Sequence, residues 1–189
     1  MSRLLFLSAA LATCLAAPAL ADEPVRTVDA GRFEVQGIRL GMNLAEATAA
    51  VAQQLGIAPG AIQVSKPSRD EPQVLLASNP AGNLTVTLAP GRLDGDPRRA
   101  GVYSVRWSYK GLRDLDARKA AVLARYGLPT NGTATPLRKG WEWCLHPDDG
   151  SPVRCLGTPE PTLTYYEFTL ELQDSSRLAE PGDAPAGAK

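Results

Sequence analysis

The chain has 189 residues, with 20 basic and 20 acidic side chains, so its formal net charge at neutral pH is zero. This length fits one or at most two small globular domains, and the lack of a basic excess argues against a dedicated nucleic-acid binder. The 17 glycines and 16 prolines follow no period, which argues against a fibrous chain.

Residues 1–21 have the pattern of a cleaved export signal. Arg3 gives a positive start, residues 4–17 are almost entirely apolar, and residues 19–21 form an Ala-Leu-Ala cleavage site. We therefore expect a mature chain that begins at Asp22, lies in the periplasm or outside the cell, and has no transmembrane segment.

Two other interpretations of this segment remain. A membrane anchor is disfavoured because the apolar run is short, is broken by Pro18 and has no basic stop behind it. Attachment of a lipid at Cys14 is disfavoured because Thr13 stands where a lipobox has a small residue.

Two stretches, residues 43–57 and 114–128, align at an offset of 71 positions and predict two short helices. Each opens with a possible N-cap acceptor, Asn43 or Asp114, and each has a glycine near its end. The alignment predicts one domain over residues 22–173, built from two repeats that span about 33–100 and 101–173.

Strands are expected around the helices at residues 33–40, 74–77, 84–88, 103–110, 141–145, 153–156 and 163–172. Polar and apolar residues alternate in 103–110, as in a half-buried strand. The same pattern in 163–172 predicts that Tyr166 and Phe168 are buried and that Tyr165 faces solvent. The predicted fold is therefore α+β, with the helices packed on one face of an antiparallel sheet and the other face wet. The polar residues 174–189 are expected to be a disordered tail.

Cys144 and Cys155 are the two cysteines that would remain after export, and an even count in an oxidising compartment predicts a disulfide. Residues 147–150, Pro-Asp-Asp-Gly, lie between them and favour a turn, so the pair is expected to cross-link a hairpin. A metal site that includes His146 is the alternative, but oxidised thiols cannot ligate a metal.

Three short segments carry a resemblance to a known group of proteins. They are Gly41-Met42 before the first helix, Tyr126-Gly127-Leu128-Pro129 after the second, and Trp141-Glu142-Trp143. Their order resembles small bacterial envelope proteins, which include the small lipoprotein of the outer-membrane β-barrel assembly machine and the secreted β-lactamase inhibitor protein. The doubled unit is more similar to the tandem inhibitor, and the lack of a convincing lipobox departs from the lipoprotein. The resemblance covers residues 33–172 and implies a scaffold that binds other proteins.

The function expected from these observations is an exported, non-enzymatic module that binds another envelope or secreted protein. No cofactor, metal ligand or catalytic residue is assigned, because His146 is the single histidine and no nucleophile motif accompanies it. One alternative is an envelope-directed hydrolase that uses Glu142, Glu167 and Glu171 on the wet face. Another alternative is a small-molecule carrier with a deep apolar pocket.

Strand alternation also predicts which residues would contact a partner. Residues opposite the expected buried positions of the second repeat would share one wet surface if these strands belong to one sheet. The candidate partner-binding residues are Arg106, Lys110, Glu142, His146, Tyr165 and Glu167.

Overall fold

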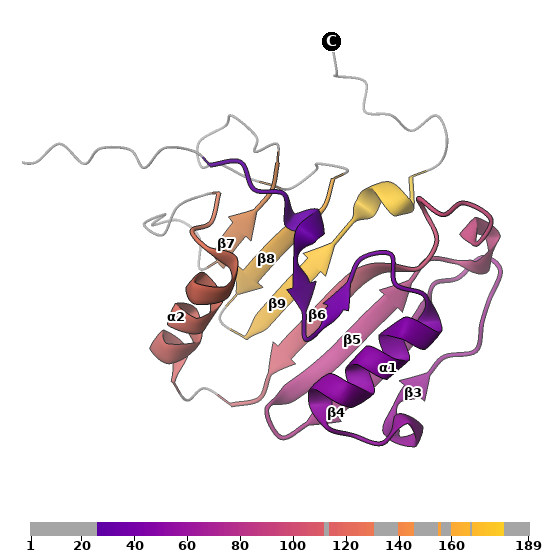
Figure 1. Cartoon of the computed structure of the whole chain (residues 1–189), viewed down its shortest axis with the longest axis horizontal. Helices are drawn as coiled ribbons and strands as arrows, with labels where there is room; N and C mark the ends of the chain where they lie inside the picture. Colours follow the sequence, from indigo (N-terminus) through magenta and orange to yellow (C-terminus); the bar gives the residue numbers. More distant parts are fainter. Residues whose placement is uncertain are drawn as a thin grey trace, which may run out of the picture.

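The structure is a computed structural model, which describes residues 26–111, 114–130, 140–145, 155, 160–166 and 168–179. Its helices are α1 (Leu44–Leu55) and α2 (Leu115–Tyr126). Its strands are β1 (Glu34–Val35), β2 (Ile38–Arg39), β3 (Gln63–Val64), β4 (Gln73–Asn79), β5 (Gly82–Leu88), β6 (Val102–Tyr109), β7 (Gly140–Trp143), β8 (Thr162–Tyr166) and β9 (Thr169–Gln173). Seven strands form an antiparallel sheet in the order β3-β4-β5-β6-β9-β8-β7, while β1 and β2 form a separate hairpin (Figure 1). The predicted α+β class is confirmed.

The first helix has the ends that the sequence predicts. The Asn43 side chain accepts a hydrogen bond from the Glu46 N–H at 3.0 Å, and the Glu46 carboxylate accepts one from the Asn43 N–H at 2.9 Å. This capping box satisfies two amides at the helix start. After α1 the chain turns away at Gly56, whose φ of 63° is readily adopted by glycine.

The second helix starts differently from the prediction. Asp114 has a φ of 61°, and its side chain makes no capping hydrogen bond, so the expected similarity of the two N-caps is wrong. The cause lies in the left-handed backbone conformation of Asp114 itself, because a capping side chain normally projects from an extended residue.

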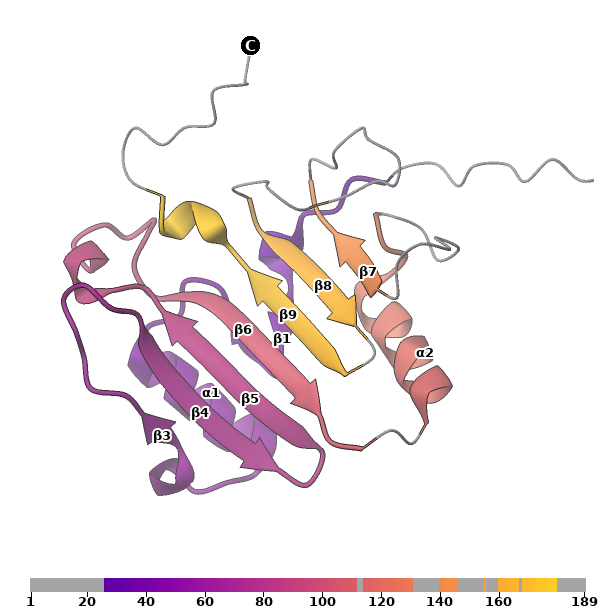
Figure 2. The same cartoon turned by 180° about the vertical axis from the view of Figure 1, so that it is seen from behind.

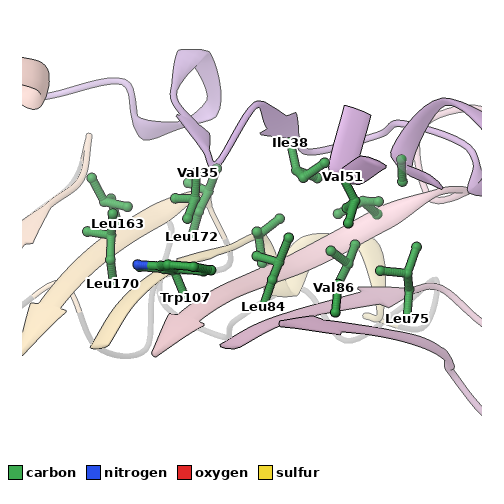
Figure 3. Close-up of a cluster of buried hydrophobic side chains, with 14 of the residues drawn as sticks. Val35, Ile38, Val51, Leu75, Leu84, Val86, Trp107, Leu163, Leu170 and Leu172 are labelled. Atoms are coloured by element: carbon green, nitrogen blue, oxygen red, sulfur yellow. The ribbon is translucent and has the colours of Figure 1, made fainter. Parts of the chain in front are cut away.

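One face of the large sheet is covered and the other is open. The small β1-β2 sheet and α1 lie across one face in Figure 1, and the view from behind in Figure 2 shows the opposite face uncovered by any described element. Apolar side chains from neighbouring strands align on the covered face, where Val35, Ile38 and Val51 pack onto them (Figure 3). One such row consists of Leu75, Val86, Val105, Leu172, Leu163 and Trp143.

Contacts of Tyr126 attach α2 to the covered side of the sheet. Its ring centroid lies 5.1 Å from that of Phe33 and 6.1 Å from that of Trp143. Its hydroxyl donates a hydrogen bond of 2.8 Å to the Glu34 carbonyl, and the Trp143 indole N–H donates one of 3.3 Å to the Gly127 carbonyl. The end of α2 is thus tied to both β1 and β7.

Burial gives Tyr126 a testable pH dependence. It raises the pKa of the Tyr126 hydroxyl from 10.0 to about 12. The stability that this group contributes is therefore complete below pH 10 and is lost as the pH rises toward 12, because the unfolded chain releases the proton first. We expect the free energy of unfolding, measured in urea without reductant, to fall over this range, and to fall less steeply in Tyr126→Phe. Equal slopes for the two proteins would contradict the expectation.

The β8-β9 hairpin corrects the prediction for residues 163–172. They do not form one strand, because Tyr166 pairs with Thr169 across a tight turn. Tyr165 consequently faces the core with Leu170, whereas Tyr166 and Phe168 are exposed. Each short strand does alternate, but the turn changes the phase of the alternation.

The strands that follow the two helices meet at the β6-β9 pair of the large sheet. Strands β3, β4, β5 and β6 follow α1 and lie on one side of this junction, while strands β7, β8 and β9 follow α2 and lie on the other. The expected strands near the start of the two repeats, residues 33–40 and 103–110, differ in position, because β1 and β2 lie outside the large sheet and β6 lies within it.

The chain after β9 continues in a defined conformation. Ser175–Arg177 form a 3-10 helix, so the expected tail does not begin at Asp174. Arg177 pairs with the Asp174 carboxylate at 3.0 Å and donates a hydrogen bond to the Ala100 carbonyl at 2.9 Å. These contacts hold this segment against the loop that precedes β6.

The expected disulfide is present. Cys144 and Cys155 are bonded, with their Cα atoms 5.8 Å apart. The turn expected between them lies outside the described residues, as do all of residues 146–154. Within the described residues, neither helix is long and apolar enough to cross a membrane.

Candidate functional site

The open face of the large sheet carries polar side chains in rows that cross the strands. This follows from the register, since the residues that alternate with the core positions align on the opposite face. The central row consists of Thr85, Arg106, Glu171, Thr164 and Glu142. The sequence prediction that Arg106 and Glu142 belong to the same sheet face is therefore correct in register.

Arg106 and Glu171 form an ion pair at the centre of this row. A guanidinium nitrogen of Arg106 lies 2.9 Å and 3.0 Å from the two carboxylate oxygens of Glu171. The Arg106 side chain remains 54% exposed, so the pair contributes about 0 to 1 kcal/mol to stability. Its exposed guanidinium can therefore contact a carboxylate of a partner at small cost.

A shallow depression of about 260 Å³ adjoins this ion pair. It is lined by Arg106, Glu171, Thr85, Thr87, Tyr103, Ser104 and Gln173. Burial raises the pKa of the Tyr103 hydroxyl, so this group is uncharged at neutral pH. The lining thus offers hydroxyl and amide groups around a single pair of opposite charges.

Lys110 lies just past the end of β6. Its ammonium group donates a hydrogen bond of 2.8 Å to the Asn79 carbonyl at the end of β4, and its side chain is exposed. Lys110 is therefore placed at one end of the open face, beside the β4-β5 turn.

The strand register places Glu142 on the open face of the sheet, but its side chain is buried. It is 2% exposed, because the disulfide brings Cys155 against it, and its carboxylate accepts a hydrogen bond of 2.9 Å from the Cys155 N–H. The adjacent backbone is also covered, since the Glu142 carbonyl accepts a hydrogen bond of 2.7 Å from Thr130. The expectation that the Glu142 side chain lies on the wet surface of the sheet is wrong for this reason.

Tyr165 is likewise removed from the candidate surface. It is 2% exposed on the core face, where its ring centroid lies 5.4 Å from that of Trp141. His146 and Glu167, the remaining two candidates, lie outside the described residues.

Two exposed aromatic residues were missed by the sequence analysis. Tyr166 is 46% exposed and Phe168 is 40% exposed, beside the turn between β8 and β9. A Cβ atom added to Gly140 would lie 2.7 Å from the Tyr166 ring, so the ring occupies the space above this glycine on the open face. The available signal was the odd spacing of the apolar residues Tyr165 and Leu170, which breaks a period of two.

Of the carboxylates considered for hydrolysis, the two that the structure describes do not share the depression beside Arg106. Glu171 lines the depression next to Arg106, while Glu142 is buried against Cys155 and is not part of that lining. Glu167 lies outside the described residues.

Comparison of the chain with protein-family models, with curated proteins and with solved structures finds no match. The functional interpretation therefore rests on the geometry of the sheet and on the residues that it exposes.

Proposed function

We propose that this chain is an exported, non-enzymatic module that binds another protein of the bacterial envelope or of the secreted fraction through the open face of its sheet. The observation that carries the proposal is the exposure of Tyr166 and Phe168 beside an uncovered sheet face, which is mostly polar but also exposes Leu76. Aromatic side chains and arginine contribute most of the binding energy at many protein interfaces. Arg106 lies on the same face, in the row adjacent to that of Tyr166.

Export is supported by the disulfide. A bond between Cys144 and Cys155 persists in an oxidising compartment such as the periplasm, which agrees with the proposed cleavage of residues 1–21. The mature chain would begin at Asp22.

The strand order supports the proposed two-unit architecture in a modified form. Each unit would have a helix and three antiparallel strands, α1 with β4, β5 and β6 and α2 with β7, β8 and β9, while the short strand β3 between α1 and β4 has no counterpart in the described part of the second unit. The two units would then meet at the β6-β9 pair, and β6 would belong to the first unit. This arrangement favours the proposed similarity to the tandem β-lactamase inhibitor protein.

Binding can be tested with a partner isolated from envelope extract and then purified. We expect Tyr166→Ala to weaken the measured affinity at least about tenfold and Arg106→Ala at least about fivefold, because both side chains would be covered by the partner. Thermal stability should be nearly unchanged, since both residues are exposed.

The matched control is Arg39→Ala. Arg39 is an exposed arginine on β2, on the covered side of the sheet. Its replacement should leave the affinity unchanged. If Arg39→Ala weakens binding as much as Arg106→Ala does, or if neither open-face variant has an effect, the open face is not the binding site.

A further inference from the structure

A cavity of about 360 Å³ lies at the end of the sheet where α1 begins. The start of α1, the chain before β4 and the loop between β5 and β6 come together at this end in Figure 1. The cavity is larger than the depression beside Arg106, and its volume is at the lower end of the range for small-molecule sites. Its described lining residues include none of Arg106, Tyr166 and Phe168, so this site is separate from the surface proposed above to bind a protein.

The polar part of the lining offers oxygen acceptors to a ligand. Asp94 brings a carboxylate, and its Oδ2 atom would lie 3.6 Å from a Cβ atom added to Gly91. The Ser68 carbonyl oxygen would lie 3.1 Å from the same Cβ position, so both oxygens border the space beside Gly91. This carbonyl accepts a hydrogen bond of 3.0 Å from the Gly91 N–H, and a carbonyl oxygen has a second lone pair for a ligand.

Asp94 carries a charge that the fold does not use. In the described part of the chain its carboxylate makes no hydrogen bond or ion pair, and only its N–H is bonded, to the Gly91 carbonyl at 3.2 Å. Asp94 is the C-cap of the 3-10 helix Gly91–Leu93, and at this end of a helix the backbone presents carbonyl oxygens rather than N–H donors. The carboxylate is therefore available to a cation that enters the cavity.

The two side-chain amides in the lining do not oppose a cation. Gln73 donates a hydrogen bond of 3.0 Å from Nε2 to the Ser65 carbonyl, and within the described residues its Oε1 atom accepts none. Asn43 contributes a neutral amide, whose oxygen accepts the Glu46 N–H. No lysine or arginine is among the described residues that line the cavity, so Asp94 sets the sign of the charge there.

The rest of the lining defines the apolar part of the ligand. Leu88 and Ala89 are buried, and the partly buried Leu44 packs against the core. We propose that this cavity binds a small primary amine in its protonated form. Its ammonium group, which has three donors and no acceptor, would contact the Asp94 carboxylate and the Ser68 carbonyl, and its apolar part would lie against Leu44 and Leu88.

The test is a titration of the purified chain with benzylammonium chloride at neutral pH, followed by ¹H–¹⁵N NMR. We expect saturable shifts of the amides of Leu44, Gly91 and Gly101, with a dissociation constant on the order of 1 mM. Benzyl alcohol, which has nearly the same shape without the charge, should bind at least about fivefold more weakly, because it cannot form a charge-assisted hydrogen bond. Methylammonium, which has the charge without the ring, should also bind at least about fivefold more weakly, because it buries little apolar surface.

A pair of variants locates the charge that binds the amine. Asp94→Asn should weaken benzylammonium binding at least about fivefold, and should remove the preference for benzylammonium over benzyl alcohol. The matched control is Asp70→Asn, because Asp70 is an exposed aspartate on the chain before β4 that is not among the described lining residues. It removes the same charge and should change the dissociation constant by less than about twofold, since salt screens exposed charges outside the cavity.

The proposal is wrong if benzyl alcohol or methylammonium binds as tightly as benzylammonium, or if the two variants weaken binding equally. It is also wrong if the amides of the native chain do not shift at about 20 mM benzylammonium. The comparisons made on the native chain need no variant, so they hold even if a substitution in the loop disturbs the fold.

Discussion

Replacing Cys155 with serine is expected to lower the free energy of unfolding by about 2 to 4 kcal/mol. The disulfide closes a loop between positions 144 and 155 and restricts the unfolded chain. It also holds the Cys155 N–H against the buried Glu142 carboxylate, 2.9 Å away. Without the bond, Cys155 is free to move away from Glu142, and water can then reach the Glu142 carboxylate. Urea unfolding of the oxidised native protein and of the monomeric variant measures the difference.

Reduction provides the control for this prediction. Dithiothreitol should lower the stability of the native protein to about that of Cys155→Ser, and should leave the stability of the variant unchanged. If Cys155→Ser and the oxidised native protein have the same free energy of unfolding, the disulfide does not stabilise the fold, and the prediction is wrong.

Truncating Tyr126 is expected to lower the free energy of unfolding at least as much as losing the disulfide does, because this side chain connects α2 to both β1 and β7. Tyr126→Ala should lower the free energy of unfolding by about 3 to 5 kcal/mol, as in other truncations of a buried aromatic residue. The loss includes the ring contacts with Phe33 and Trp143 and the hydrogen bond to the Glu34 carbonyl.

Tyr126→Phe separates these contributions. It keeps the ring and removes the 2.8 Å hydrogen bond, so a loss of about 0.5 to 1.5 kcal/mol is expected. Equal losses in the two variants would mean that the ring contacts contribute little and that α2 is attached mainly through its hydroxyl group.

The local features of the fold could be predicted from sequence because neighbouring residues determine them. Asn43 predicted the start of α1, and alternation in residues 103–110 placed Val105 and Trp107 in the core. The disulfide could be predicted because the expected export would leave two cysteines in an oxidising compartment.

The candidate site was less predictable, because its exposure depends on turns and on cover by distant residues. The phase of the β8-β9 hairpin decides that Tyr166, and not Tyr165, faces solvent, and no glycine, proline, asparagine or aspartate marks that turn. Glu142 has the alternation of an exposed residue, yet Cys155 covers it.

The sequence by itself therefore determined the α+β class, the first helix, the paired cysteines and the placement of Arg106 opposite the core. The tertiary structure decided which aromatic residues are exposed, that Glu142 is buried, and that Asp94 shares a cavity with Leu44 and Leu88. The physical reason is range: propensity and periodicity act over a few residues, whereas these features arise where segments far apart in the chain pack together.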